Sequence, residues 1–367
     1  MKSKTIIKHF LIWQTLIIFI VVASINFLPL RASDSYLGGG ITHYLINPVL
    51  NFRSNFDGVY YVLISTHGYN YGQQAFFPLY PSLIKFINQY TRLPIFSGTL
   101  VSSVSFLLAL YFLSRLIKLD YSSKVSYWVI LALMYFPVGF FFTAVYSESL
   151  FLMLTVLAFY CARKGHWVLA AILGGLASYT RFIGVFLFPA LLIELWQQKR
   201  PLSNAIPLLL IPVGLLIYMH YLHQTTGDAF AFYHLQKIFN QARDTQITLP
   251  YQVIWRYLKM IVTVNRADPL YLTIWLEFIT GVTFLILSVV SLFKQRLSYA
   301  LFSLCAYLIP TLTGNFVSLP RYVLICFPVF IIIGQLLSQK PRFRIVYFTG
   351  SLILLTIFLS MFAGGYW

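Results

Sequence analysis

The chain has 367 residues, of which 59% are hydrophobic and 10% charged, and it carries a formal net charge of +17. A soluble domain carries about 25% charged residues, so a water-soluble fold is excluded, and apolar runs of about 18 or more residues predict membrane-spanning helices. The basic residues form small clusters between apolar runs, as the positive-inside rule requires, so the charge does not indicate nucleic-acid binding.

The first predicted helix covers residues 10–30 and follows Lys2, Lys4 and Lys8, which place the N-terminus in the cytoplasm. Its apolar run is longer than the roughly 7–15 residues of a signal sequence, so we expect a retained helix. A long exterior loop, 31–96, follows it. The next predicted helices cover residues 97–117, 126–145, 148–162, 167–180 and 182–196, of which the last two can also form one kinked span.

The C-terminal half begins with a predicted helix and then a second long exterior loop, 222–268, with an amphipathic surface helix near Phe230–Phe239. Residues 1–367 are therefore predicted to be one polytopic, all-α membrane domain of about 11 transmembrane helices, because a backbone in lipid must pair its own polar groups. The helices of this half are predicted at 205–221, 270–293, 297–313, 323–338 and 345–363.

Acidic residues gather on the exterior side of this topology. Asp57 precedes an apolar run, and we interpret it as a general base whose pKa partial burial would raise; the alternative is an ordinary helix N-cap. Glu148 begins a predicted helix, where it either complements the helix dipole or orients a substrate or a metal. The exterior acidic residues are Asp34, Asp57, Glu148, Asp228, Asp244 and Asp268.

Two arginines lie at exterior helix junctions, far from the basic clusters of the inside ends. The helix before Arg181 has fourteen residues, or about 21 Å at 1.5 Å per residue, so it would leave Arg181 below the outer surface of a core about 30 Å thick. An arginine there costs about 2.5 kcal/mol or more and should face a wet cavity or an anion. We therefore expect Arg181 and Arg321 to clamp a substrate phosphate, although either side chain can also snorkel to lipid phosphates.

Metal and thiol chemistry have weak signals. His220 and His223 have a spacing that suits a metal but no nearby third ligand, and His67 lies nearer to Asp57. The three cysteines, at positions 161, 305 and 326, give no disulfide framework and no CxxC pattern. No cofactor is predicted, and a divalent metal stays open.

Several short stretches, in a specific order along most of the chain, carry a family resemblance. They include the sequences FDGVYY, AFFPLYP and YSESLF, and a TR pair at Arg181. Together they resemble the PIG-V (GPI mannosyltransferase 2) family. The stretches are Phe56–Tyr61, His67–Tyr69, Ala75–Pro81, Tyr146–Phe151, Arg163–Arg181, Gly227–Phe230 with Gln236, and Pro320–Tyr322.

The resemblance implies a GT-C fold and a membrane mannosyltransferase that takes its sugar from a polyprenyl- or dolichyl-phosphate sugar on the extracytoplasmic face. It assigns the catalytic base to Asp57. The family usually has Trp-Asp-Ala where this chain has Phe56-Asp57-Gly58, which keeps an aromatic wall but loses an indole donor. The residues expected to bind substrate are Glu148, Arg181, Arg321, Tyr322, Tyr60, Phe77, Tyr80 and His67.

The expected chemistry also follows from the residues. A polyprenyl-phosphate leaving group is already anionic, so it needs cations more than a proton, and direct in-line displacement would invert the anomeric centre. The expected partners are the lipid-linked donor, a lipid, glycan or protein acceptor, and membrane lipids, in the plasma membrane of a prokaryote or the endoplasmic reticulum of a eukaryote. The rivals are a transporter or lipid flippase, which usually shows paired repeats that this sequence lacks, and a scaffold subunit with a decayed site.

Overall fold

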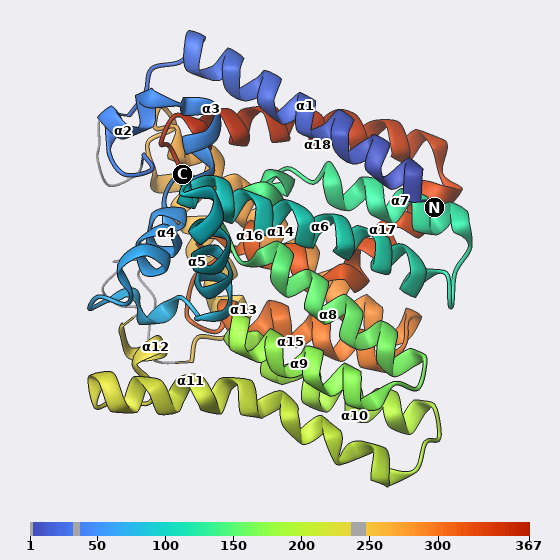
Figure 1. Ribbon diagram of the computed structural model, residues 1–367. Helices are drawn as coiled ribbons and strands as arrows, with labels where there is room; N and C mark the ends of the chain where they lie inside the picture. The colour runs from blue at the N-terminus through green and yellow to red at the C-terminus, as the bar shows by residue number, and fades with distance from the viewer. Residues whose placement is uncertain (1–2, 32–36, 236–246) are drawn as a thin grey trace.

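The computed structural model describes residues 3–31, 37–235 and 247–367, and these residues form helices and no strands. The long helices run across the view of Figure 1 in roughly one direction, with α1 (Ser3–Phe27) beside α18 (Pro341–Ala363) on one edge and α11 (Leu210–Thr226) on the other. The short helices α2 to α5 and α12 gather at one end of this bundle. The prediction of an all-α polytopic membrane protein is confirmed.

The remaining α-helices of the N-terminal half are α2 (Ile41–Ile46), α3 (Pro48–Asn51), α4 (Asp57–His67), α5 (Leu79–Thr91), α6 (Pro94–Ile117), α7 (Ser123–Met134), α8 (Glu148–Arg163) and α9 (Trp167–Thr180). Those of the C-terminal half are α10 (Leu187–Gln197), α12 (Ala231–His234), α13 (Pro250–Thr263), α14 (Leu270–Lys294), α15 (Leu297–Thr311), α16 (Leu319–Tyr322) and α17 (Phe327–Gln339). Short 3-10 segments include η1 (Phe52–Ser54), η2 (Gln73–Ala75), η3 (Gly139–Thr143), η4 (Phe182–Phe186) and η8 (Val323–Ile325).

Within the described residues, five helical stretches are long and apolar enough to cross a membrane, or six if the bent pair that ends in α17 counts as one span. Each of the eleven predicted segments contains a helix, but the count of eleven spans is not confirmed because several of these helices are short. The five stretches are 3–27, 94–117, 202–226, 270–294 and 341–363.

The segment 167–196 forms two helices, α9 and α10, with the short segment η4 between them. Arg181 adopts an extended conformation, with φ −156° and ψ 144°, and this ends α9. The chain then turns back so closely that a Cβ atom on Gly184 would lie 2.4 Å from the carbonyl carbon of Ala177. Glycine is therefore required where η4 crosses the end of α9.

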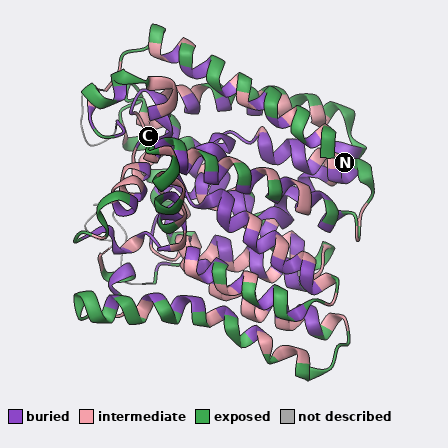
Figure 2. Ribbon diagram, in the orientation of Figure 1, coloured by how far each residue is buried: buried purple, intermediate pink, exposed green. Residues whose placement is uncertain are grey.

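Burial follows the position of each helix in the bundle, as Figure 2 shows. The outer helices α1, α11 and α18 expose apolar side chains such as Phe19 and Leu216, whereas α8 and α17 are buried on most sides. Exposed apolar side chains on outer helices are the expected surface toward lipid. The charged residues of the central helix α8 lie at its two ends, Glu148 and Arg163, and the Glu148 end belongs to the candidate site.

An ionic cluster closes the far end of α8. Glu194 of α10 is fully buried, and its carboxylate pairs with Arg296 at 2.8 Å and with Arg163 at 3.4 Å. Ser298 also donates to Glu194, and Arg163 pairs further with Asp120. This network joins the ends of α8 and α10 to the start of α15, and it lies a whole helix length from Glu148.

Candidate active site

Asp57 is the first residue of α4, and the backbone before it is strained. Phe56 has φ 55° and ψ −123°, a conformation that a residue with a Cβ rarely adopts. Phe56 is the N-cap of α4 and no side chain caps the helix, so the N-cap alternative for Asp57 is not what the structure shows. The Asp57 carboxylate points away from its own helix, toward Arg321.

Hydrogen bonds hold this strained turn in place from three sides. The Asn55 side chain accepts from the Gly38 N–H and donates to the Phe362 carbonyl, each at 2.9 Å. Arg53 is buried and donates to both the carbonyl and the hydroxyl of Thr143, also at 2.9 Å. Burial lowers the pKa of Arg53 to about 10, so it remains a cation at neutral pH.

Glu148, the first residue of α8, is brought beside Asp57 by contacts between the two preceding turns. The Val145 N–H donates to the Arg53 carbonyl at 2.8 Å, and the Tyr146 hydroxyl donates to the Asn55 carbonyl at 2.7 Å. Glu148 is 2% exposed, and its Oε2 atom has no hydrogen-bond partner among the described residues. A buried carboxylate of this kind needs cations close by.

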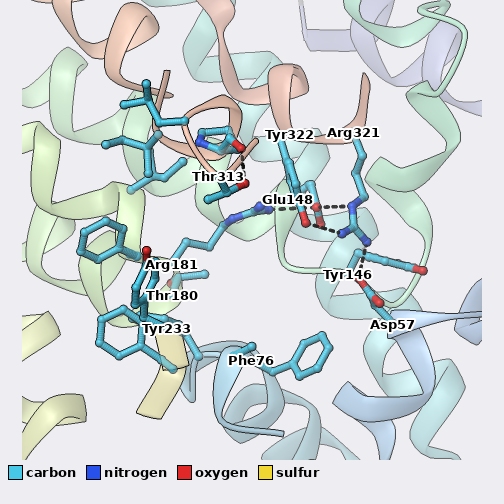
Figure 3. A pocket seen from close by; sticks show the side chains of 18 of the residues that line it. Asp57, Phe76, Tyr146, Glu148, Thr180, Arg181, Tyr233, Thr313, Arg321 and Tyr322 are labelled. Carbon is cyan, nitrogen blue, oxygen red and sulfur yellow. Dashed lines mark hydrogen bonds and ion pairs between the residues drawn. The ribbon is translucent and has the colours of Figure 1, made fainter. Parts of the chain in front are cut away.

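Two arginines supply those cations. Arg321 of α16 is buried and pairs with Asp57 at 2.8 Å and, through Nε, with Glu148 at 3.3 Å. Arg181 pairs with the same Glu148 oxygen at 2.9 Å. The ring of Tyr322 lies between the guanidiniums, 5.0 Å from Arg321 and 5.3 Å from Arg181. Figure 3 shows the resulting chain of alternating charge, Asp57–Arg321–Glu148–Arg181, which we call the charge chain.

The charge chain lines one part of a cavity of about 460 Å³. The rest of the lining is mostly apolar and comes from the first loop, η4, α12, the residues just before α13 and the end of α15. We call this set the apolar wall: Phe76, Phe77, Phe182, Ile183, Phe230, Phe232, Ile247, Ile309, Pro310 and Leu312. The cavity therefore presents fixed charges at one end and hydrocarbon along its sides, which suits an amphiphilic ligand.

Six of the nine residues singled out by sequence line this cavity, and three lie elsewhere. Tyr60 stacks on Phe76 behind the wall at 5.1 Å. Tyr80 is fully buried and donates to the Gly98 carbonyl, because its position on α5 faces α6. His67 is exposed at the last turn of α4, about 15 Å along that helix from Asp57. The six lining residues are Asp57, Phe77, Glu148, Arg181, Arg321 and Tyr322.

Sequence reasoning left several lining residues out of the set. Tyr61 lies one helical turn after Asp57, so its place on the same face of α4 was accessible from spacing alone. Burial and the nearby Glu148 carboxylate raise its pKa, which keeps the phenol protonated. Thr180, Phe182, Tyr233 and Thr313 gave no such signal, because their elements meet only in the folded bundle.

The histidine pair and the outer acidic residues do not join the site. His220 contacts Gln224, and Asp228 pairs with His234. The described residues contain no group of three His, Cys, Asp or Glu side chains placed to hold a metal ion. Asp34, Gln236 and Asp244 lie outside the described residues.

Comparison with known proteins identifies the architecture. The chain is similar in structure to ArnT from Cupriavidus metallidurans, determined bound to undecaprenyl phosphate, with a TM-score of 0.55 and 12% identity over 93% of this chain and 62% of that one. The chain thus spans less than two thirds of that protein, and the likeness shows the fold: this is an integral membrane protein with the GT-C fold of glycosyltransferases. No curated protein sequence matches the chain.

The family follows from a second comparison. A family profile described as Mannosyltransferase (PIG-V) matches residues 3–193, just over half of the chain. The chain therefore belongs to the PIG-V mannosyltransferase family, and the resemblance seen in the sequence motifs is confirmed. The matched region contains Asp57, Glu148 and Arg181, whereas Arg321 lies beyond it.

Proposed function

We propose that this protein transfers a sugar, mannose by its family, from a polyprenyl-phosphate sugar to an acceptor on the extracytoplasmic face of its membrane. The observation that carries the proposal is the charge chain at the head of a cavity with an apolar wall. The family supports glycosyl transfer, and the ArnT structure, bound to undecaprenyl phosphate, supports a lipid-phosphate ligand. The membrane is the plasma membrane in a prokaryote and the endoplasmic reticulum in a eukaryote.

The donor would bind with its phosphate toward the arginines and its prenyl chain along the apolar wall. Arg181 is the last member of the charge chain and pairs with Glu148 through Nη1. A guanidinium fork matches phosphate oxygens well, and the low dielectric of a closed cavity strengthens the contact. Phe230 and Phe232 would cover isoprene units beyond the first two of the chain.

In the transfer step, the acceptor hydroxyl attacks the anomeric carbon while the bond from that carbon to the phosphate oxygen breaks. Asp57 accepts the hydroxyl proton, and the electron pair of the broken bond leaves with the lipid phosphate. Attack from the face opposite the phosphate inverts the anomeric centre. Arg321 would exchange its contact with Asp57 for one with the departing phosphate, which leaves the Asp57 carboxylate open to the acceptor.

The test is transfer by Asp57→Asn protein in membranes, with radiolabelled mannosyl polyprenyl phosphate as donor. Loss of a general base typically costs about 10²–10⁴-fold in turnover. The matched control is Asp268→Asn, because Asp268 is an exposed acid just before α14 that accepts a hydrogen bond from the Leu270 N–H. Turnover of Asp57→Asn equal to the wild type, at equal expression, would show that Asp57 is not the base.

A second candidate function, a transporter or lipid flippase, is favoured by one observation. The pair α16–η8 and α17 is bent by 83°, and its short half carries Arg321. Broken helices that present polar groups at membrane depth are common in transporters. Reconstituted vesicles separate the two functions, since movement of the lipid-linked sugar without any glycosidic product would support the transporter.

A further inference from the structure

Glu277 is a buried acid about two turns into the membrane-spanning helix α14, and its carboxylate accepts hydrogen bonds from two other parts of the chain. Glu277 is 5% exposed. The Tyr257 hydroxyl donates to Oε2 at 2.7 Å, and the backbone N–H of Ser318 donates to Oε1 at 2.8 Å. An ionisable residue inside a membrane span is costly, so its contacts are expected to serve function.

Ser318 is the residue from which the Arg321 turn starts. It has φ 61° and ψ 8°, a left-handed conformation that is unfavourable for a residue with a Cβ. Its carbonyl accepts from the N–H groups of Arg321 and Tyr322, at 3.1 and 3.2 Å. Ser318 therefore connects the two residues: its carbonyl holds the backbone of Arg321, and its N–H donates to Glu277.

The single turn α16 is not stable by its own hydrogen bonds, because one helical turn fixes several dihedral angles for very few hydrogen bonds. Its support comes from α13 and α14. The Tyr257 ring lies 5.0 Å from the ring of Phe316, and Phe316 fills the space beside Gly281, where a Cβ would lie 2.7 Å from that ring. Arg256 of α13 donates to the Gly314 carbonyl at 2.6 Å.

Tyr257 and Ser318 both donate to residue 277, so they favour a side chain that can accept two hydrogen bonds. Burial and the Glu277 carboxylate raise the pKa of Tyr257, so the phenol keeps its proton and donates. A backbone N–H can only donate. The carboxylate accepts both bonds, whereas glutamine accepts one and must use Tyr257 as an acceptor for its amide hydrogens.

We propose that Glu277 is a positioning residue for the charge chain: through Ser318 it sets the place of Arg321 between Asp57 and Glu148. Glu277 itself is not among the residues that line the cavity. Its effect on catalysis rests on the proposed function, but its effect on the position of the 312–318 loop does not. A displacement of about 1 Å at a catalytic group can cost about 10²-fold in rate, so the anchor matters although it touches no substrate.

The first experiment measures how accessible the 312–318 loop is, and it does not depend on transferase activity. Val317, half-buried in the loop, is replaced by cysteine in full-length protein whose three native cysteines are serine, and the rate of maleimide labelling is measured in detergent. We expect Glu277→Leu to raise this rate at least tenfold and Glu277→Gln to raise it much less. Ser288→Ala, which removes another buried polar group of α14, is the control and should leave the rate unchanged. An unchanged rate in Glu277→Leu overturns the proposal.

The second experiment asks whether Glu277 acts through Arg321. We expect Glu277→Leu to lower kcat by about 10–100-fold with a smaller change in donor KM, and Glu277→Gln to recover most of the loss. In an Arg321→Lys background, Glu277→Leu should add little, because the group that it positions is already altered. Multiplicative losses would overturn the coupling. A wild type without transfer activity would refute the proposed function, and the labelling result would still decide the role of Glu277.

Discussion

The guanidinium of Arg321 lies 2.8 Å from the carboxylate of Asp57 although the two residues come from opposite ends of the chain. The same guanidinium contacts Glu148, so a single buried arginine joins both acids of the site. The two acids and two arginines of the charge chain balance in formal charge. An incoming phosphate would therefore compete with carboxylates for the same guanidiniums.

Arg321→Gln should damage both the fold and the reaction. Removing one partner of a buried ion pair costs about 3–5 kcal/mol, and Arg321 is the ion-pair partner of both Asp57 and Glu148. Transfer should fall by about 10²–10³-fold with the loss of one cationic contact to the leaving phosphate. Thermal unfolding in detergent and initial rates in membranes measure the two effects separately. Arg321→Lys should regain stability but little activity, since a lysine cannot reach both carboxylates through a planar fork.

Arg181→Gln should act mainly on donor binding. Arg181 contacts Glu148 and the Tyr322 ring and is the more exposed of the two arginines. Its loss removes an ion-pair partner from one carboxylate, whereas the loss of Arg321 removes a partner from two. We expect affinity for undecaprenyl phosphate to fall by about tenfold or more, which corresponds to the roughly 1.5–3 kcal/mol of a hydrogen bond to a charged group. Arg92→Gln, at an exposed position after α5, provides a control of equal charge change. Equal affinities for the two variants would argue against a phosphate at Arg181.

The sequence predicts the helices well and the site only in part. Apolar runs locate every long helix because lipid admits little else. The positive-inside pattern gathers Asp57, Glu148, Arg181 and Arg321 on one face, but which acid pairs with which arginine depends on the packing of helices distant in sequence. The bend before α17 and the break at Arg181 are also products of packing.

Two further residues show why the rest escapes sequence reasoning. Tyr80 shares a motif with Phe77, yet Phe77 precedes α5 and contacts Tyr218 at 4.8 Å, while Tyr80 lies within α5 and bonds to Ser102 of α6. Glu277 sits in an apolar run without any motif around it. Its partners, Tyr257 and Ser318, are distant in sequence, so no local sequence pattern predicts the role of Glu277.

Phe230→Ala should reduce the preference for long prenyl chains. Phe230 lines the cavity while half of its surface stays exposed, at 52%, so replacing it with alanine removes part of the apolar wall without opening a hole in the buried core. We expect the donor KM to rise for a C55 chain and to change little for a C10 chain, because a buried CH₂ contributes about 0.8 kcal/mol. Phe86→Ala, an exposed phenylalanine of α5 outside the cavity, is the control. Equal changes for both chain lengths would contradict the placement of the chain.

Chelation should leave transfer unchanged. The two carboxylates nearest the proposed phosphate are both paired with Arg321, and the guanidiniums offer the charge that a divalent cation would otherwise supply. Activity measured after EDTA treatment, with and without added Mg²⁺ or Mn²⁺, checks this expectation. A loss that metal restores would show that a cation joins the site and displaces at least one arginine contact.

Glu194→Gln should separate stability from catalysis. The buried carboxylate of Glu194 holds Arg163 and Arg296 at the end of α8 opposite Glu148, and glutamine would leave Arg296 without this partner and Arg163 with Asp120 alone. We expect the free energy of unfolding to fall by about 3–5 kcal/mol, as for other broken buried pairs, while the donor KM of the folded fraction stays within about twofold. Thermal unfolding and steady-state rates on the same preparation measure both. A change in KM comparable to that of Arg181→Gln would show instead that the two ends of α8 are coupled, so that the ionic cluster transmits its state to the substrate cavity.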